Sequence, residues 1–586
     1  MEADVSVRFS KLLWLLLAGL ALVAGSQDAS AAASVNAITL AVSPNPAKVK
    51  QKITLTASVT TDKKPATGGT VTFFDGKLPV ARAQVVGTKP AKGYKTGNAI
   101  LTTILGPGAH SLTAVYAGIA KSPKPVTSKL VNLKVTGNTA STTVLTAKHN
   151  QKNPKNYDFT ATVHGFGFAA PTQMTDFSDI TSNTDLGHAT LGKTAIHSLG
   201  NGLMTNAQGK PTQTVVADFN GDGFPDVAAA DAAFGPSTMV VFLGKANGEF
   251  KAPVSYPAGY FASSILAGDF NNDGILDLAV MSQDGVVALF LGNGDGTFQT
   301  SLNDSIGGLP VAITLGDFNR DGILDFASTD YFANTASVSL GNGDGTFQAP
   351  VAYPVGSGPY FIASGDFNND GFQDLTVVND NVNTVSVLLG NGDGTFQKQK
   401  TFGTGNQVEY VAVADLNADG NQDLVVANYS DQNVGVLLGN GDGTFQNQVP
   451  YAVGGPDSAI AVGDLNGDGI PDLAVSYYVP AKIGVLIGKG DGTFQPVRDY
   501  DTGQSQGFEV TIVDLNGDGT PDLISSDINA SLSILLNQTD AKAKLTNIVV
   551  PGTSKDNEKI VATYGGDSRY AKSKSKPITV KGSGGQ

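Results

Sequence analysis

The chain of 586 residues contains no cysteine, and its five histidines all precede residue 198. The absence of cysteine excludes disulfides, thiolate nucleophiles and cysteine-ligated zinc sites. The single tryptophan, Trp14, lies in an apolar segment at the N-terminus. Charged residues are only 15% of the chain, the formal net charge is −14, and no run of lysine and arginine is present. This composition argues against a nucleic-acid partner.

Glycine, in contrast, is abundant, with 71 residues, and apolar residues make up 41% of the chain. The apolar content is sufficient for buried cores, while few segments have a helical pattern. This combination is typical of turn-rich all-β structure. The length indicates roughly three or four domains.

The first 31 residues have the layout of a secretory signal peptide. Arg8 and Lys11 precede the apolar run 12–25, and the small residues Ala29, Ser30 and Ala31 follow it. We expect residues 1–31 to be a signal peptide cleaved after Ala31. The alternative, a retained membrane anchor, needs about 20 apolar residues, and this run has 14. The mature protein is therefore expected to be secreted or at the cell surface (extracellular or periplasmic), with no transmembrane span.

The pattern D-x-N-x-D-G-x-x-D occurs seven times, with spacings of 48 to 51 residues. Each copy follows a short apolar run such as 411–414 and precedes two more, as in 423–428 and 433–439. A turn of the NGDGTF type and an extended stretch complete most units. Four strands in a unit of about 50 residues predict a β-propeller blade, so seven units predict seven blades.

The ends of the repeat region predict how the ring closes. The seventh unit ends at its third strand, 531–537, and the segment 197–211 before the first loop can supply a fourth. We predict that this segment completes the last blade. Closure would remove exposed sheet edges, which are an aggregation hazard.

Two further β regions flank the repeats. Alternating strands with Pro and Gly turns predict an Ig-like sandwich, Ig-like domain 1, over residues 35–137. A second copy begins after residue 138, and its closing strands follow the repeats, where Tyr564 matches Tyr116. We therefore expect Ig-like domain 2 to consist of residues 138–195 plus 541–583, split by a propeller of residues 196–540. A closed ring brings its two ends together, which makes such an insertion feasible.

The predicted fold class is thus all-β, a seven-bladed β-propeller inserted into an Ig-like β-sandwich and preceded by a second Ig-like β-sandwich.

The repeated loop matches the first nine positions of a calcium-binding loop. Side chains would come from positions 1, 3, 5 and 9 and a carbonyl from position 7, with glycine at position 6 for the turn. Oxygen ligands of this kind suit Ca²⁺ better than zinc or copper.

About seven Ca²⁺ sites are predicted. The ligand residues are Asp218, Asn220, Asp222, Phe224, Asp226, Asp269, Asn271, Asp273, Ile275, Asp277, Asp317, Asn319, Asp321, Ile323, Asp325, Asp366, Asn368, Asp370, Phe372, Asp374, Asp415, Asn417, Asp419, Asn421, Asp423, Asp464, Asn466, Asp468, Ile470, Asp472, Asp514, Asn516, Asp518, Thr520 and Asp522. The alternative is that Asp and Asn only cap turns through Asx hydrogen bonds. A turn needs one or two such residues and gains nothing from three mutually repelling anions. Seven ions would balance the net charge of −14, with dissociation constants of about 10⁻⁴–10⁻³ M.

Units such as VAVADLNADGNQDLVVANYSDQNVGVLLGNGDGTF resemble FG-GAP/VCBS-type repeats, which also form the integrin α-subunit propeller. This resemblance covers about residues 213–537. The stretches SPNPAKVKQKITLTASV and LTAVYAG are similar to bacterial Ig-like repeat domains. The resemblance implies calcium at the loop positions. It also implies an exported protein used in adhesion, in recognition or as part of a surface assembly.

The residues give no sign of catalysis. No histidine lies within 213–537, and the glutamates there, Glu249, Glu409 and Glu509, occupy different points of the repeat. Serine and threonine have no base beside them to activate a nucleophile. Two catalytic carboxylates could come together by chance in the folded chain, but nothing in the sequence points to such a pair. We therefore predict no enzymatic activity and no catalytic residue, and an enzyme acting on polysaccharide is the least supported hypothesis.

The propeller fold would place the calcium loops and the NGDGTF turns on one face. The opposite face varies from unit to unit and holds aromatic residues that could stack on a ligand ring. These candidates are Tyr260, Phe261, Tyr331, Phe332, Tyr360, Phe361, Tyr410, Tyr429, Tyr477 and Tyr478. The alternative is that they fill space between blades. The sequence predicts either an adhesion or recognition protein for a polysaccharide or surface protein, or a structural spacer without its own ligand.

Overall fold

The computed structural model describes residues 35–48, 51–61, 70–75, 78–84, 86–87, 96–103, 108–116, 126–136, 138, 141–165, 173–199, 203–206, 211–231, 236–245, 248–306, 308–502, 507–518, 520–527, 531–567 and 570–583. The predicted signal peptide, residues 1–31, lies outside these residues. Regular structure in the described ranges is β throughout, except for one 3-10 turn, η1 (Tyr429–Asp431). The all-β prediction is confirmed. None of the helical structure found in these ranges has the length and apolar character of a membrane span.

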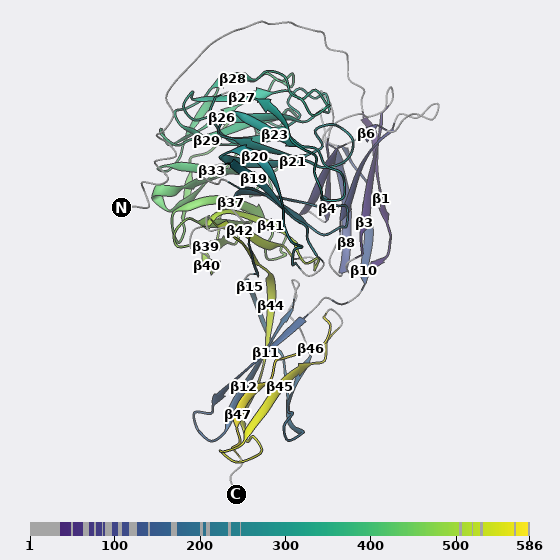
Figure 1. Ribbon diagram of the computed structural model, residues 1–586, viewed down its shortest axis with the longest axis vertical. Helices are drawn as coiled ribbons and strands as arrows, with labels where there is room; N and C mark the ends of the chain where they lie inside the picture. Colours follow the sequence, from purple (N-terminus) through teal and green to yellow (C-terminus); the bar gives the residue numbers. More distant parts are fainter. Residues whose placement is uncertain are drawn as a thin grey trace.

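Two sheets packed face to face form a first sandwich within residues 35–136 (Figure 1). One sheet has the order β1 (Val35–Ser43), β3 (Ile53–Thr61), β7 (Thr96–Thr103) and β6 (Val86–Gly87). The other has the order β2 (Ala47–Lys48), β10 (Val131–Thr136), β8 (Gly108–Tyr116), β4 (Thr70–Asp75) and β5 (Leu78–Gln84), with β9 (Val126–Thr127) on β8. Alternate residues of both sheets, such as Leu55 and Phe73, meet in one core.

A second sandwich combines strands from both sides of the repeats. Its first sheet has the order β11 (Ser141–His149), β12 (Tyr157–Gly165), β44 (Asn537–Ile548) and β15 (Gly192–Leu199). Its second has the order β14 (Thr184–Thr190), β13 (Met174–Asp179), β45 (Asn557–Tyr564) and β46 (Ser573–Lys574), and β47 (Ile578–Lys581) also pairs with β45. The expected domain borders at residues 195 and 540 fall inside β15 and β44. These two strands therefore join the repeats to the sandwich.

Tyr564 is fully buried in the core of the second sandwich, as Tyr116 is in the first. The two tyrosines occupy the ends of the corresponding strands β45 and β8. This equivalence follows the sequence match between the two copies.

The described residues of the repeat region form seven antiparallel sheets of four strands each. In six of them the strands follow chain order: β17 (Pro211–Ala217), β18 (Asp226–Asp231), β19 (Pro236–Phe242), β20 (Val254–Tyr260); β21 (Ala262–Gly268), β22 (Asp277–Ser282), β23 (Val286–Phe290), β24 (Leu302–Ser305); β25 (Pro310–Gly316), β26 (Asp325–Asp330), β27 (Thr335–Ser339), β28 (Val351–Pro354); β29 (Pro359–Gly365), β30 (Asp374–Asn379), β31 (Thr384–Leu388), β32 (Lys400–Gly403); β33 (Val408–Ala414), β34 (Asp423–Asn428), β35 (Asn433–Leu437), β36 (Val449–Ala452); β37 (Asp457–Gly463), β38 (Asp472–Tyr477), β39 (Lys482–Leu486), β40 (Arg498–Asp501).

The last sheet takes one strand from before the first repeat. Its order is β16 (Leu203–Asn206), β43 (Ser531–Leu535), β42 (Asp522–Asp527) and β41 (Gly507–Val513), with Leu203 opposite Ile534. The segment that the sequence analysis assigned to this position thus pairs with the third strand of the seventh repeat.

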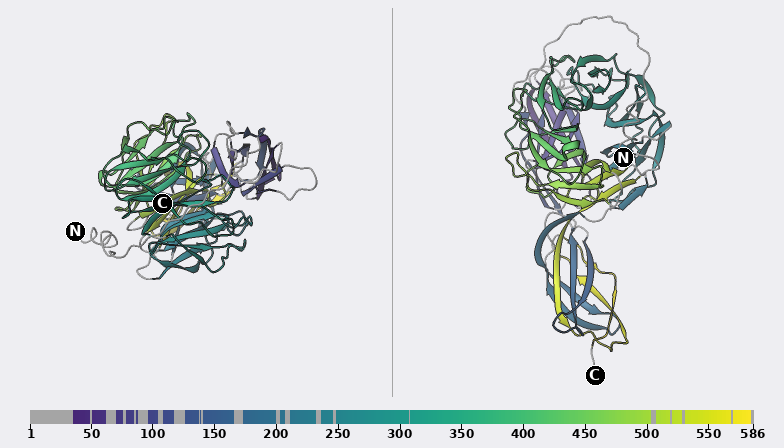
Figure 2. Two further views of the ribbon diagram at one scale, coloured as in Figure 1. Left: turned by 90° about the horizontal axis from the view of Figure 1, so that it is seen from above. Right: turned by 90° about the vertical axis from the view of Figure 1, so that its left-hand side faces the viewer.

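Consecutive repeat sheets share apolar cores. A cluster of buried residues joins each sheet to the next, and a further cluster joins the seventh to the first, with Leu515 and Ile534 packed with Val227 and Phe242. Second strands such as β30 and β34 are buried along their whole length. Their apolar runs are continuous because both faces of the sheet are covered. Figure 2 shows the sheets arranged around a common axis.

Candidate functional site

Each D-x-N-x-D-G-x-x-D loop joins the first strand of a repeat sheet to the second. In the fourth repeat, the loop runs from Asp366, directly after β29, to Asp374, the first residue of β30. Gly371 at loop position 6 has φ of 82°, and Asn369 at position 4 has φ of 58°. Both values lie in the left-handed region, which an L-residue adopts at a cost and glycine adopts freely. The glycine at position 6 is therefore required by the backbone, as the motif predicted.

The left-handed residue at position 4 was not predicted from the sequence. Other repeats place Asn272, Arg320 and Ala418 there, with φ between 57° and 63°. The sequence carries a partial signal, because five of the seven position-4 residues are Gly or Asn, which accept this conformation most readily.

Within the loop, side-chain oxygens accept backbone N–H groups a few residues ahead. In the fourth loop, Asp366 Oδ2 accepts from Gly371 at 2.9 Å, and Asp370 Oδ1 accepts from Phe372 at 2.8 Å. The other loops have related bonds, and these are the Asx hydrogen bonds of the turn-capping alternative. In the ranges that the structure describes, no group of three or more acidic or histidine side chains converges as a metal cluster. The calcium ligands stay a prediction.

The aspartate at position 9 has a structural role that the sequence analysis missed. Asp374 is fully buried, its Oδ2 accepts the N–H of Phe367 at 2.8 Å, and its Oδ1 accepts the N–H of Gly390 at 2.7 Å. It therefore ties the start of the loop to the hairpin before the NGDGTF turn. The six equivalent residues bond in the same way: Asp226, Asp277, Asp325, Asp423, Asp472 and Asp522.

Burial raises the pKa values of these carboxyls, with a smaller contribution from neighbouring aspartates. The pKa rises to about 6 for Asp226, Asp277 and Asp423, to about 7 for Asp325, Asp374 and Asp472, and well above the usual value for Asp522. At position 1, burial also raises the pKa of Asp317, to about 6, and of Asp366. Both burial and the repulsion between neighbouring aspartates favour the neutral form of these carboxyls.

The donor set of these loops fits a hard cation. Asp317 Oδ1, Asp366 Oδ1 and Asn516 Oδ1 are buried oxygens without a hydrogen-bond partner. A buried acceptor left unsatisfied is costly, and each of these oxygens is at a ligand position of the motif. With oxygen-only donors and three carboxylates per loop, the residues suit Ca²⁺.

Two basic residues that the sequence analysis passed over lie beside the loops. The Arg320 guanidinium lies 4.7 Å from the ring centroid of Phe372, so it spans the third and fourth loops. Burial lowers the pKa of Arg320, while the charges of Asp317 and Asp370 act against this shift. Lys52 of the first sandwich contacts Gly223 of the first loop, and its charge counteracts the burial that raises the pKa of Asp218.

The NGDGTF turns connect neighbouring repeats. The N–H of Gly394 donates to the carbonyl of Phe318 in the preceding loop at 3.0 Å, and Gly443 donates to Phe367 at 2.8 Å. The phenylalanine that ends each turn is largely buried, as in Phe445. These turns thus contact the loop of the preceding repeat.

The aromatic candidates for the variable face fall into three groups. Tyr260 and Phe332 are more than half exposed. Seven are half-buried, namely Phe261, Tyr331, Tyr360, Phe361, Tyr410, Tyr429 and Tyr478. Among these, the rings of Phe361 and Tyr410 lie 4.0 Å apart across two repeats.

The structure corrects the prediction for Tyr477. It is fully buried in the core between the fifth and sixth repeats, and its hydroxyl donates to Asp499 Oδ1 at 3.0 Å. The prediction that Tyr477 lies on the ligand face is therefore wrong. The residue belongs to β38, a second strand that is buried along its length.

The chain matches two protein-family models. One, described as FG-GAP-like repeat, matches residues 218–280, 270–328, 317–377, 366–426, 415–475 and 464–525, which together span more than half of the chain. The other, described as bacterial Ig-like domain (group 3), matches residues 40–136. The search of curated proteins found no match.

Solved structures give distant likenesses. One is a functionally unknown protein from Desulfotomaculum acetoxidans, with 13% identity, a TM-score of 0.36, and coverage of 54% of this chain and 95% of that protein. Another is a candidate 6-phosphogluconolactonase from Bacteroides uniformis, with 14% identity, a TM-score of 0.40, and coverage of 56% and 97%. TM-scores below 0.5 establish neither the fold nor the activity of this chain.

Proposed function

This chain belongs to the FG-GAP-like repeat proteins, and from that premise we propose that it is an exported, calcium-stabilised recognition protein without enzymatic activity. The observation that carries this proposal is the repeated loop. Seven copies gather carboxylates whose pKa values burial raises, and two of them leave a buried carboxylate oxygen unbonded. FG-GAP-like repeats and bacterial Ig-like domains are typical of extracellular proteins, in agreement with the signal-peptide layout of residues 1–31.

For the architecture, we propose a closed seven-bladed propeller inserted into the second, Ig-like sandwich. The pairing of β16 with β43 and the core shared by the seventh and first sheets support closure. The pairing of β12 with β44, where Phe159 lies opposite Leu545, supports insertion. The domains would then be those expected from the sequence, with β15 and β44 crossing their borders.

The junction between the last and first sheets provides a pH test of this closure. Glu509 on β41 is largely buried, and its Oε2 accepts the N–H of Thr214 on β17 at 2.6 Å. Burial raises the pKa of Glu509 to about 8, and the charge of Glu509 in turn adds to the burial that raises the pKa of Tyr410. Because the folded pKa exceeds the unfolded one, the stabilisation is complete below about pH 4.5 and is lost as pH rises through about 8.

Glu509→Gln should remove this pH dependence, since the amide oxygen can still accept from Thr214. We expect equal unfolding free energies for the variant and wild type near pH 5, and a variant more stable by about 2–4 kcal/mol at pH 9. Urea denaturation at fixed calcium measures this difference, and shared titrations elsewhere cancel in it. Parallel pH curves for the two proteins would refute the role of Glu509 at the junction.

In the proposed calcium loops, the chain's own residues set up the site. Gly371 adopts the left-handed conformation that the turn of the loop requires, and Asp374 bonds the start of the loop to the following hairpin. Asp366, Asn368, Asp370, Asp374 and the carbonyl of Phe372 would hold the ion, and the other loops would use their equivalents. A bound Ca²⁺ would supply two positive charges to each loop and so offset the carboxylate repulsion.

We place recognition of a polysaccharide or surface protein on the variable face. Tyr260 and Phe332 support this assignment, because both are exposed aromatic side chains. Tyr260 is the last residue of β20, before the next repeat sheet, and Phe332 lies in the turn between β26 and β27. Tyr331 donates to Asn381 Oδ1 at 3.1 Å, so an aromatic ring and an amide are held together there. The burial of Tyr477 and the stacking of Phe361 on Tyr410 favour the second candidate function, a structural spacer in a surface assembly.

Binding to a broad polysaccharide and glycan panel, in millimolar calcium and in EDTA, tests the recognition role. We expect binding in calcium, its loss in EDTA, and a decrease of at least tenfold in affinity for the double variant Tyr260→Ala, Phe332→Ala. Val449→Ala, an exposed apolar residue on an outer strand, is the matched control and should bind as wild type. A folded protein that binds no glycan under either condition would favour the spacer role or a protein partner.

A further inference from the structure

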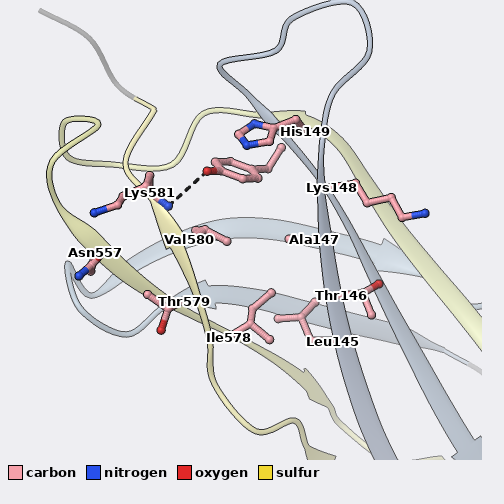
Figure 3. Close-up of a pocket in the computed structure, with 11 residues that line it drawn as sticks. Leu145, Thr146, Ala147, Lys148, His149, Asn557, Ile578, Thr579, Val580 and Lys581 are labelled. Atoms are coloured by element: carbon pink, nitrogen blue, oxygen red, sulfur yellow. Dashed lines mark hydrogen bonds between the residues drawn. The ribbon is translucent and has the colours of Figure 1, made fainter.

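The second sandwich has a groove of about 600 Å³ along its edge strands β11 and β47. Figure 3 shows that Leu145, Ala147, Ile578 and Val580 form its apolar floor. The groove lies far in sequence from the repeat loops and is separate from the proposed calcium sites. Its volume falls in the range of pockets that hold ligands.

The equivalent place in the first sandwich is filled by a strand. There β10 corresponds to β47, and β2 pairs in parallel with it, with Ala47 opposite Val135. Ala47 is buried in the core, and Thr136 Oγ1 donates to the Ala47 carbonyl at 3.2 Å. Among the described residues of the second sandwich, β47 pairs only with β45.

The connection between β11 and β12 explains this difference. Asn150 Oδ1 accepts the N–H groups of Lys152 and Asn153 at 3.0 and 2.9 Å, and the N–H of Asn150 donates to the carbonyl of Asn156 at 2.9 Å. These bonds form a tight Asx-type turn. The chain therefore passes directly from β11 into β12. In the first sandwich, the segment between β1 and β3 instead contains β2, which pairs with β10.

The outer edge of β47 has one backbone group that is already bonded within the sandwich and others that face outward. The N–H of Lys581 donates to the hydroxyl of Tyr157 at 3.2 Å, so it points away from β45 (Figure 3). Antiparallel strands alternate, so the N–H and C=O of Thr579, two residues earlier, also point away from β45. An open edge of this kind is a template for an added strand.

The charge around the groove selects the partner. Lys148, His149 and Lys581 are among its lining residues, none of which is acidic, and the side chain of Lys148 points away from the apolar floor (Figure 3). Two copies of this edge would repel each other if they paired. We propose that the groove binds an extended, acidic segment of a partner protein by strand addition to β47, in the position that β2 occupies in the first sandwich.

The test uses the full chain and short labelled peptides. The probe is an acetylated seven-residue peptide of alternating valine and aspartate. Its controls replace aspartate with lysine or carry N-methyl groups on alternate residues, which block backbone pairing. Fluorescence anisotropy should show that the acidic peptide binds at least tenfold more tightly than either control. Equal binding of the three peptides, or no binding at millimolar concentration, would overturn the proposal.

Two variants separate charge from strand addition. Lys148→Glu with Lys581→Glu should weaken binding of the acidic peptide at least tenfold, whereas Lys155→Glu with Lys572→Glu, exposed lysines outside the groove, should not. Thr579→Pro removes an outward N–H that β45 does not use, so it should abolish binding while the melting temperature stays within a few degrees.

Retention of binding in both groove variants would refute the site.

The acidic repeats of a second copy are a competing occupant, because residues 196–540 hold 40 acidic against nine basic residues. Sedimentation that shows self-association of wild type, lost in the Lys148→Glu, Lys581→Glu variant, would replace the partner segment with a second copy.

Discussion

Chelation of calcium is expected to lower the unfolding free energy of the repeat region by about 10 kcal/mol. With dissociation constants of about 1 mM and about 10 mM calcium, each site contributes about 1.4 kcal/mol, and there are seven proposed sites. The physical reason is the set of carboxylates whose charged form burial and neighbouring aspartates disfavour, a cost that a bound cation would offset. Calorimetry and urea denaturation in calcium and in EDTA measure this effect.

The matched control is magnesium at the same concentration and ionic strength, because Mg²⁺ requires near-ideal octahedral geometry and sheds its water reluctantly. Magnesium should restore only a minor part of the stability. The chain has no cysteine, so disulfide exchange does not complicate the comparison. Identical melting temperatures in calcium and EDTA would show that the loops are turn caps alone, and the calcium part of the proposed function would fail with them.

The sequence predicted the parts of this molecule that repeat. The ligand pattern and its spacing indicated four strands per unit, and the described residues of the repeat region form seven four-stranded sheets. The glycine at position 6, such as Gly371, was predictable because a left-handed residue must occupy that turn. Periodicity was informative here because the same local constraint recurs in each unit.

The features that the sequence could not predict depend on contacts between distant residues. The two bonds of Asp374 reach Phe367 and Gly390, so its role appears only once strand and turn are placed. Tyr477 is the last residue of β38 and is buried, whereas its neighbour Tyr478 follows the strand and is half-buried. Both faces of β38 are covered, so the pattern could not tell that Tyr477 is buried. Arg320 belongs to one loop and stacks on Phe372 of the next.

The fourth loop allows ligand and structural roles to be separated with two isosteric substitutions. Asp374→Asn is expected to cost about 2–4 kcal/mol with or without calcium, because an amide can accept only one of the two backbone N–H groups that the buried carboxylate satisfies. Asp370→Asn keeps the acceptor for Phe372 in an exposed position. It should change stability by less than about 0.5 kcal/mol in EDTA.

Calcium distinguishes the two variants. Asp370→Asn should lose about 1 kcal/mol of the calcium-dependent stabilisation, because one proposed site is weakened while the fold is intact. Urea denaturation of wild type and both variants, each in calcium and in EDTA, gives the six free energies that are needed. If Asp374→Asn destabilised the protein only in calcium, position 9 would be a ligand without a structural role. If Asp370→Asn had the same effect in calcium and EDTA, position 5 would belong to the turn and not to an ion.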